Sequence, residues 1–464
     1  MPTTADASPE TAHVKLVDGP ETTATTPGDP LSDTSTLPAV WVGPTKRRVT
    51  CPHCWTRFHL GDTLWIARHS SLRGDPVAGD EAMRRFLPTR FDVQGRAIDA
   101  GGEPCHELAC PSCRLPVARA LLEAGQVFLS LVGVPASGKS YLTAAMSWRL
   151  RTVLPQWLGW SFRDVDAGNN ATLIANEQTL FLQERGDVPV SIEKTQLQGA
   201  HYDPVRFGER QVQLARPFQF VMHDERHGDE QRPPRVLNLY DNAGEHFLPG
   251  QDSALSPGTQ HVARANAVMF LFDPLQDPRC RAAIAHHDRD PQLDDAMAET
   301  SVRQDTVLNE MAARVRRYAG LDETTPLETP LLVLVGKADT WLDHAGLSWG
   351  PDPEPVVPIP DARGGGFAVD TDLIERVSGA VRAWLATTTP EFVSLAEASH
   401  RVVRYLPVSA LGGPPVRRED GSLAVVPGRL APRWVAAPVL YAMSKWATGL
   451  LPTVRDDLGG GPNQ

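Results

Sequence analysis

The chain has 464 residues, which is more than a single small domain needs and, at about 150 residues per domain, allows roughly three units. Asp and Glu outnumber Lys and Arg by 56 to 45, giving a formal net charge of −11, and 41% of the residues are hydrophobic. This composition indicates a globular protein without a basic field along the whole chain. Any contact with nucleic acid therefore has to be local, and the longest apolar stretches, 127–135 and 434–444, are too short to span a bilayer.

Residues 1–45 predict a disordered tail, because Thr, Pro, Asp and Ala predominate and large apolar side chains are few. The tail does not have the basic start and apolar core of a secretory signal, nor the arginines of a transit peptide, so we expect a cytoplasmic protein. In that reducing compartment, clustered cysteines indicate a metal site rather than disulfides.

Residues 46–118 predict a small zinc-ribbon-like module. Two C-P-x-C knuckles, Cys51-Pro-His-Cys54 and Cys110-Pro-Ser-Cys113, each place two thiolates on one cation. Four thiolates form the closed tetrahedral site of structural zinc, so we expect Zn²⁺ on these four cysteines. The alternative ligands are Cys105, His106, His53 and His59.

The value expected of such a module is a rigid interaction surface, because a closed cysteine site has no open coordination position for catalysis. Arginines and aromatic residues are interleaved along it, which is the pattern of a nucleic-acid surface. Acidic residues interrupt the arginines, so nucleic acid is not the favoured partner, and we expect an effector protein instead.

Residues 119–464 predict one α/β domain with long loop insertions. The expected strands are the apolar runs 127–132, 218–222, 236–240, 268–272, 331–335 and 402–407. The expected helices cover 296–319, ended by Gly320, and a segment after Asp372. This alternation is typical of a mostly parallel sheet with flanking helices. The charged stretch 223–235 predicts a connection between two antiparallel strands, and the Pro- and Gly-rich segments 349–366 and 412–428 predict surface loops.

A phosphate-binding loop is predicted at residues 133–140, which fit G-x-x-x-x-G-K-[ST] between an apolar strand and a helix. Its glycines let successive backbone N–H groups point inward, and the helix N-terminus adds positive charge. Lys139 is expected to reach the β- and γ-phosphates, and Ser140 to ligate Mg²⁺. The expected nucleotide contacts here are Gly133, Ala136, Ser137, Gly138, Lys139, Ser140 and Tyr141. The loop alone does not choose between ATP, GTP and other phosphate donors.

Three later motifs each follow an apolar strand. They are Asp241-Asn-Ala-Gly244, Gly336-Lys337-Ala-Asp339 and Val408-Ser409-Ala410-Leu411. At a strand end, the Asp241 carboxylate is placed to hold Mg²⁺ and the Gly244 N–H to meet a γ-phosphate. The three motifs occur in this order along the chain, each at the end of a strand.

At these residues the chain resembles the Ras-like and translation-factor-like GTPases (TRAFAC class), over about residues 127–450. The resemblance implies a P-loop NTPase sheet and a pocket in which Asp339 reads guanine, Lys337 packs along the base, and Ser409 and Ala410 complete the base pocket. It also implies Mg²⁺ held by Ser140, Asp241 and a threonine of the first switch. Thr172, Thr179 and Thr195 are the candidates for this threonine, and Thr195 is the choice.

The sequence departs from the pattern of that class at several positions. Gly336 stands where Asn is usual, which removes a side chain that bridges the base and the phosphate loop. Glu245 and His246 follow Gly244 where Gln or His usually orients the attacking water, so the expected catalytic set is Lys139, Gly244, Glu245 and His246. A carboxylate near the γ-phosphate makes slow intrinsic turnover an expectation. Pro135 lies inside the phosphate loop, where it removes one N–H donor.

The combination of a zinc ribbon with a long-looped GTPase-like domain also resembles the "double-GTPase" families of bacterial conflict and signalling gene clusters. The function predicted from the sequence is a Mg²⁺-dependent switch that binds GTP and GDP and hydrolyses GTP. Two alternatives stay open at this point. One is a nucleotide-binding scaffold or adaptor that does not hydrolyse, and the other is an ATP-using member of the P-loop superfamily, such as an ATPase or a kinase.

Overall fold

The structure is a computed structural model of the chain, and it describes residues 48–192, 202–226, 233–242, 247–248, 257–284, 290–293, 302–359, 366–447 and 450–453. The predicted tail, 1–45, lies outside these residues. Among the described helices, none combines the length and the apolar character that crossing a bilayer requires.

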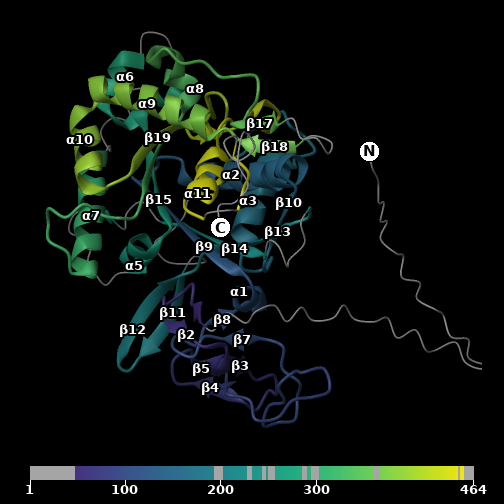
Figure 1. The fold of residues 1–464 in the computed structure, drawn as a ribbon. Coiled ribbons are helices and arrows are strands. Elements are labelled where there is room, and N and C mark those ends of the chain that lie inside the picture. Colours follow the sequence, from purple (N-terminus) through teal and green to yellow (C-terminus); the bar gives the residue numbers. More distant parts are fainter. Residues whose placement is uncertain are drawn as a thin grey trace, which may run out of the picture. The chain divides into compact units, whose positions relative to one another are not determined.

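The first described elements are short strands and turns around the two cysteine knuckles (Figure 1). Strand β1 pairs with β2 around the first knuckle, and β7 pairs with β8 around the second. The bounds are β1 Val49–Thr50, β2 Arg57–Phe58, η1 Leu60–Asp62, β3 Leu64–Ile66, β4 Arg73–Asp75, β5 Gly79–Met83, β6 Arg85–Phe86, β7 Leu108–Ala109, β8 Pro116–Val117 and α1 Arg119–Glu123. The predicted boundary between residues 118 and 119 stays a prediction.

A seven-stranded sheet follows, in the order β10-β13-β14-β9-β15-β16-β19. Strands β14, β9, β15, β16 and β19 run parallel, whereas β13 is antiparallel to both β10 and β14. The bounds are β9 Gly125–Gly133, β10 Trp160–Asp164, β13 Phe218–Asp224, β14 Arg235–Asp241, β15 Ala267–Phe272, β16 Leu331–Val335 and β19 Val403–Pro407. The predicted mostly parallel sheet is confirmed, as is the antiparallel pair joined across 223–235.

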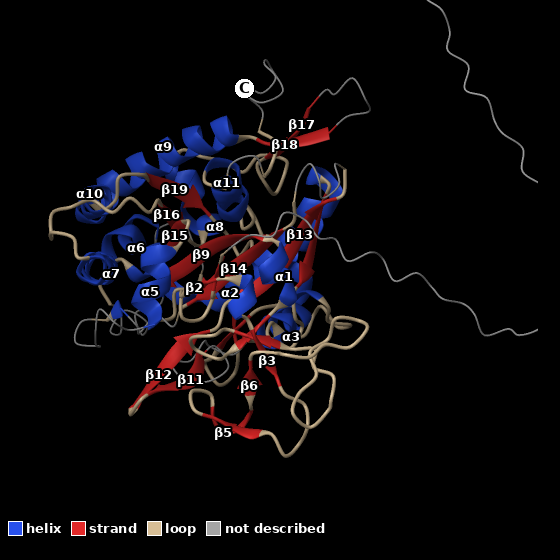
Figure 2. Ribbon diagram, turned by 60° about the horizontal axis from the view of Figure 1, so that its bottom comes forward, coloured by secondary structure: helices blue, strands red, loops and turns tan. Residues whose placement is uncertain are grey.

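Helices cover both faces of this sheet (Figures 1 and 2). Met269 and Leu271 of β15 pack in the core that contains residues of α2, α3 and α11, whereas Phe270 and Phe272 pack in the core with α5, α6, α7 and α10. Helix α9 contributes to both cores. This alternation is what a strand buried on both faces requires. The bounds are α2 Lys139–Val153, η2 Leu154–Leu158, α3 Ala171–Phe181, α5 Pro257–Arg264, η4 Pro274–Gln276, α6 Pro278–Ile284, η5 Pro291–Leu293, α7 Gln304–Ala319, α8 Ala338–Trp341, η7 Leu342–Ala345, α9 Thr371–Thr388, α10 Pro390–Ser399, η8 Pro427–Arg429 and α11 Ala437–Lys445.

Some predicted boundaries are wrong. Helix α7 ends as predicted, with Gly320 at φ 66°, but it begins at Gln304, and Arg303 before it is extended. Residues 296–301 of the predicted helix lie outside the described residues. The predicted loop 412–428 contains a short hairpin, a second hairpin begins inside the predicted loop 349–366 and ends beyond it, and a third precedes β13. Their strands are β17 Val356–Ile359 with β18 Gly366–Val369, β20 Val416–Arg417 with β21 Leu423–Ala424, and β11 Tyr202–Phe207 with β12 Arg210–Ala215.

The N-terminus of α11 is capped by a buried carboxylate from a distant loop. Glu354 is 1% exposed and accepts hydrogen bonds from the backbone N–H groups of Ala436 and Ala437, at 3.1 to 3.3 Å. Arg149 lies 3.6 Å from the same carboxylate. Burial raises the pKa of Glu354 to about 7, although the Arg149 guanidinium and the two N–H donors oppose that rise.

We expect ionisation of Glu354 to destabilise the fold as the pH rises. Its pKa is higher in the folded chain than the ordinary value of 4.5. The protonated side chain therefore stabilises the fold fully below pH 4.5, and this stabilisation is lost as the pH rises through 7. Between pH 4 and 8 the free energy of unfolding should fall by about 3 kcal/mol relative to a Glu354→Gln variant, at about 1.4 kcal/mol per pKa unit. Urea unfolding of both proteins across this range measures the difference. Parallel curves would show that Glu354 is not the group responsible.

Candidate functional site

Four sequence motifs and one further loop each follow a parallel strand of the sheet. The phosphate loop follows β9, Asp241 is the last residue of β14, and Asp273 follows β15. Lys337 lies in the turn after β16, and Ser409 follows β19. Because the carboxyl ends of parallel strands meet at one edge of a sheet, this topology gathers the motifs into one region.

The backbone of the phosphate loop has the curl that its motif predicts. Ala136 (φ 58°) and Gly138 (φ 91°) are both in the left-handed region, separated by a residue that is not. Such alternation turns successive N–H groups toward one centre and forms an anion-binding nest. At Gly133, a Cβ atom would lie 2.8 Å from the backbone oxygen of Leu271, so the strand end accepts glycine only. Helix α2 then begins at Lys139.

The side chain of Lys139 folds back over this loop. Its Nζ atom donates to the carbonyl oxygens of Gly133 (3.0 Å) and Val134 (2.8 Å), and the residue is 6% exposed. Ser137 Oγ also donates to the Val134 carbonyl, at 2.8 Å. The loop therefore holds a buried ammonium group next to its curled amides.

The second group of motif residues forms a compact polar cluster. Ser409 Oγ donates to Asp339 Oδ1 and accepts from the Gly412 N–H at 2.9 Å. Lys337 is left-handed (φ 52°), and its Nζ lies 2.6 Å from Asp273 Oδ2. Just beyond it, Trp341 donates its indole N–H to the Gly336 carbonyl at 2.8 Å. These bonds fix the Asp339 carboxylate and the Lys337 ammonium in place.

One cavity of about 530 Å³ joins the phosphate loop to this cluster. Its volume is in the range of small-molecule sites. The predicted residues that line it are Ala136, Ser137, Gly138, Lys139, Ser140, Tyr141, Lys337, Asp339 and Ala410. Gly133 and Ser409 are not among its lining residues, but they form hydrogen bonds with Lys139 and Asp339, which do line it.

Several residues that line the cavity do not belong to any of the sequence motifs. Ser191 and Ile192 come from the segment after α3, and Asp290 and Gln292 from the segment between α6 and α7. The Ile192 N–H donates to the Tyr141 hydroxyl at 3.4 Å, and burial raises the pKa of that tyrosine. These residues reach the cavity only through the fold, so no pattern in the sequence could have identified them.

The residues predicted to bind magnesium and to orient water are described only in part. Asp241 ends β14 and is 9% exposed, and it is not among the residues that line the cavity. Gly244, Glu245, His246 and Thr195 lie outside the described residues. The two other candidate threonines, Thr172 and Thr179, lie within helix α3.

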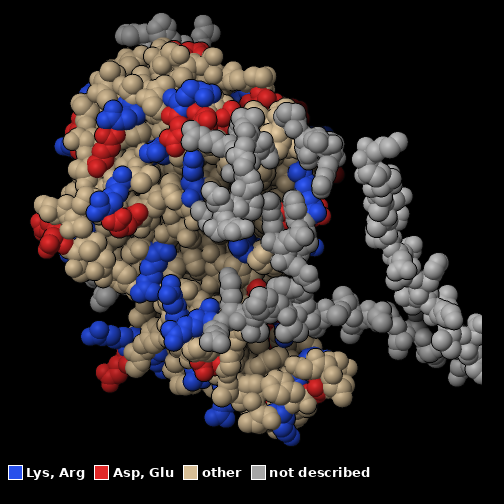
Figure 3. Space-filling view, in the orientation of Figure 1, with Lys and Arg blue, Asp and Glu red and all other residues tan. Residues whose placement is uncertain are grey.

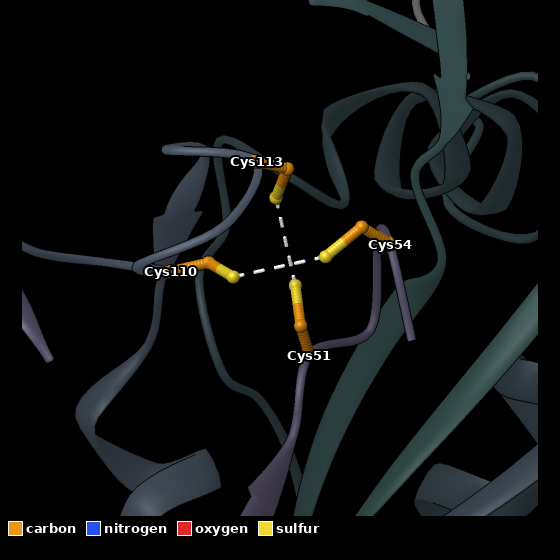
Figure 4. Close-up of side chains that lie close together, drawn as sticks. All are labelled: Cys51, Cys54, Cys110 and Cys113. Atoms are coloured by element: carbon orange, nitrogen blue, oxygen red, sulfur yellow. Dashed lines mark hydrogen bonds between the residues drawn. The ribbon is translucent and has the colours of Figure 1, made fainter. Parts of the chain in front are cut away.

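The four knuckle cysteines converge as predicted (Figure 4). The sulfur atoms of Cys51 and Cys113 are 3.7 Å apart, as are those of Cys54 and Cys110, and all four lie within 4.8 Å of one another. A tetrahedral zinc with bonds of about 2.3 Å needs sulfur atoms about 3.8 Å apart. The donor chemistry and the spacing therefore both fit Zn²⁺. Cys105, His106, His53 and His59 are outside this cluster.

The two knuckles repeat the same local geometry. In each knuckle, a backbone N–H group donates to the sulfur of the first cysteine at 3.4 Å. The donor comes two residues after that cysteine and is His53 in the first knuckle and Ser112 in the second. The residue after the second cysteine is left-handed in both, Trp55 at φ 62° and Arg114 at φ 60°. Matching hydrogen bonds and turns orient the sulfur atoms toward a common centre.

The first knuckle also contacts the central sheet. The Tyr240 hydroxyl, on β14, donates to the Pro52 carbonyl inside the knuckle. The Trp55 ring packs against Phe128 and Tyr240, with centroids 4.6 and 5.6 Å away. The knuckle is therefore fixed to the strand that ends at Asp241.

Charge on the face shown in Figure 3 is mixed. Basic and acidic side chains are interspersed over the described surface, and several basic side chains gather in the region where Figure 1 places β11 and β12.

No protein-family model matches the chain. Among curated proteins, it is 26% identical over 321 residues to a protein of Mycolicibacterium smegmatis with the provisional name ESX-1 scaffolding and assembly protein SaeC. That match covers 65% of this chain and 73% of the relative.

Similar solved structures include translation elongation factor SelB from Methanococcus maripaludis with a GTP analogue (10% identity, TM-score 0.20), Sup35 with GDP (14%, 0.22) and Aquifex aeolicus Era with GDP and AlF4− (12%, 0.19). These matches cover 62%, 63% and 63% of this chain, but only 30%, 39% and 53% of those chains. Likenesses with TM-scores this low carry no argument about function.

Proposed function

We propose that the chain is a Mg²⁺-dependent protein that binds GTP and GDP, hydrolyses GTP, and acts as a switch read by an effector protein. One observation carries the proposal: a single cavity is lined both by the phosphate loop with Lys139 and by Lys337 and Asp339. A nucleoside triphosphate needs a cationic, amide-rich site for its phosphates and a separate polar site for its base.

The phosphate end is supported by the curled loop and the buried ammonium group of Lys139. In the proposal, the γ-phosphate replaces the two carbonyl oxygens as the acceptor of Lys139, and backbone N–H groups bind the remaining oxygens. Mg²⁺, held by Ser140, Asp241 and Thr195, would neutralise charge on the β- and γ-phosphates.

Hydrolysis is proposed to proceed by attack of water on the γ-phosphorus, which breaks its bond to the β–γ bridging oxygen and releases GDP and inorganic phosphate. Glu245 and His246, next to Gly244, are the residues proposed to orient that water. Lys139 and the loop amides stabilise the charge on the transferring group.

The base end is supported by the Asp339–Ser409 hydrogen bond, which holds the carboxylate at the cavity wall. A fixed carboxylate can accept from the guanine N1–H and exocyclic amine together, and adenine does not offer these donors. Lys337 is proposed to pack along the base, and Ala410 to complete the pocket. Guanine is therefore the base proposed.

The four cysteines Cys51, Cys54, Cys110 and Cys113 would hold one Zn²⁺, which supplies a cross-link between the two knuckles and no catalysis. We propose the module as the surface for an effector protein. The hydrogen bond from Tyr240 of β14 to this module supports the proposal, because Asp241 is the next residue of that strand.

Nucleotide affinities test the base assignment. The unsubstituted chain should bind GTP at least about a hundredfold more tightly than ATP, because buried polar groups left unpaired by the wrong base cost several kcal/mol. Asp339→Asn should lose GTP affinity to a similar degree and gain affinity for xanthosine triphosphate, whose C2 carbonyl accepts from the new amide. Titration calorimetry with Mg²⁺ measures both changes.

The control for this experiment is Asp322→Asn, an exposed aspartate in the turn after α7. It should bind GTP as the unsubstituted chain does. Unchanged GTP affinity in Asp339→Asn would show that the guanine assignment is wrong, and equal affinity for ATP and GTP in the parent chain would favour an ATP-using protein.

A second candidate is a nucleotide-binding scaffold that does not hydrolyse GTP. The provisional name of the Mycolicibacterium smegmatis relative, a scaffolding and assembly protein, favours it. GTP binding without phosphate release in the presence of Mg²⁺ would support this candidate over the switch. Membership of the double-GTPase families stays a prediction.

A further inference from the structure

The turn between β15 and α6 contacts both loops of the cavity. Asp273, the first residue after β15, forms the ion pair with Lys337 at 2.6 Å. Three residues later, the side-chain amide of Gln276 donates to the backbone oxygen of Pro135 in the phosphate loop, at 3.1 Å. One short turn therefore connects the phosphate loop to the base-side lysine.

This turn is itself held firmly. Asp273 is fully buried, and its Oδ1 accepts the Leu275 N–H at 3.0 Å. Gln304, the first residue of α7, bonds both backbone groups of Asp273 at 2.8 Å, accepting from its N–H and donating to its carbonyl. The Asp273 carboxylate thus has a fixed position from which to hold Lys337.

Gly336, the residue before Lys337, cannot itself connect the base-side loop to the phosphate loop, so the turn supplies that connection. Gly336 has no side chain with which to reach across to the phosphate loop, and its backbone N–H bonds to the Phe272 carbonyl at 2.8 Å. The base-side loop is therefore anchored to the end of β15, and Gln276 extends this anchor to Pro135.

We propose that Asp273 and Gln276 are positioning residues that hold the phosphate loop and Lys337 at the separation that a guanine nucleotide spans. The proposal rests on the proposed function, because only a ligand that touches both loops gains from their fixed separation. Asp273 also neutralises the Lys337 ammonium group and holds it away from the base. The methylene stem of Lys337 is then the part of that side chain that meets the base.

The test compares a ligand that spans both loops with ligands that touch one. Gln276 is half-buried, so Gln276→Ala should fold, and Gln213→Ala, exposed on β12, is the matched control. We expect GDP to bind Gln276→Ala about tenfold more weakly and to be released faster, as loss of one hydrogen bond to an ordered loop predicts. Guanosine and pyrophosphate, each of which touches one loop, should change by less than about twofold relative to the control.

Equal losses for all three ligands would indicate local damage to the loop and overturn the proposal, and so would unchanged GDP affinity. A second variant, Asp273→Asn, keeps the acceptor for Leu275 and the size of the side chain but removes the charge. It should weaken GDP more than guanosine, because both meet Lys337 but only GDP spans the two loops, and it should leave pyrophosphate within about twofold of the control. Its unfolding temperature in the absence of nucleotide should stay within a few degrees of the parent. If the parent chain binds no guanine nucleotide at all, the proposed function falls, and this inference with it.

Discussion

Replacing Lys139 with alanine is expected to weaken binding of GDP and GTP by a hundredfold or more. The lysine is 6% exposed and donates to two loop carbonyl oxygens, so a charged donor is already placed inside the phosphate loop. Charge-assisted bonds to phosphate are stronger than those to carbonyl oxygen, and a loss of about 3 kcal/mol corresponds to about a hundredfold in affinity. Titration of a fluorescent GDP analogue measures the change.

Lys445→Ala is the matched control for this substitution. Lys445 is the last residue of α11, where its ammonium group lies 5.9 Å from the Tyr441 ring centre, and it does not line the cavity. The affinity of the Lys445→Ala variant for GDP should stay within about twofold of the parent affinity. The unfolding temperature without nucleotide shows whether Lys139→Ala folds. Affinity close to that of the parent in a folded Lys139→Ala variant would contradict the phosphate-loop assignment.

The central strands were predictable because each is buried on both faces. A run such as Leu331–Val335 is apolar throughout, which is the pattern of a parallel strand in the middle of a sheet. The edge strand β10, Trp160–Asp164, was missed because Ser161 interrupts its apolar residues and it ends in two charged residues. Helix α3 and the β11–β12 hairpin were also missed, because half-exposed elements carry a weaker periodic signal.

The start of α7 shows a different limit of sequence reasoning. The apolar repeat and Gly320 predicted the end of this helix correctly. Its beginning depends on Gln304, whose side chain bonds the backbone of Asp273 on another strand end, and that tertiary contact leaves no periodic trace. A helix start set by such a contact can be located only once the topology is known.

Some parts of the candidate site could be predicted from short motifs, and others could not. The curl of the phosphate loop and the cysteine knuckles are local backbone features, so short motifs predict them. Asp273, Gln276 and Asp290 belong to segments with no motif, and they reach the cavity region because β15 lies between β9 and β16. Residues that act through the fold in this way escape a reading of the chain alone.

Replacing Cys110 with serine is expected to abolish stoichiometric zinc binding and to lower the free energy of unfolding by about 4 kcal/mol or more. Serine does not supply a thiolate, and three remaining sulfur ligands leave the closed site incomplete. Stability should fall because Cys51, Cys110 and Cys113 are fully buried in a core that also contains Val236 of β14. Zinc content per chain and urea unfolding measure the two effects.

Cys105→Ser is the control that decides between ligand sets. Cys105 is equally buried and lies in the same part of the chain, but it belongs to a separate apolar cluster, and its sulfur lies 3.6 Å from the Glu103 carbonyl. A serine there can donate to the same carbonyl, so one zinc per chain and nearly the parent stability are expected. If instead Cys105→Ser loses the metal while Cys110→Ser retains it, the alternative ligands are the correct ones. Retention of full stability in a zinc-free Cys110→Ser variant would separate the metal from the fold, because the buried knuckles would then be held by packing alone.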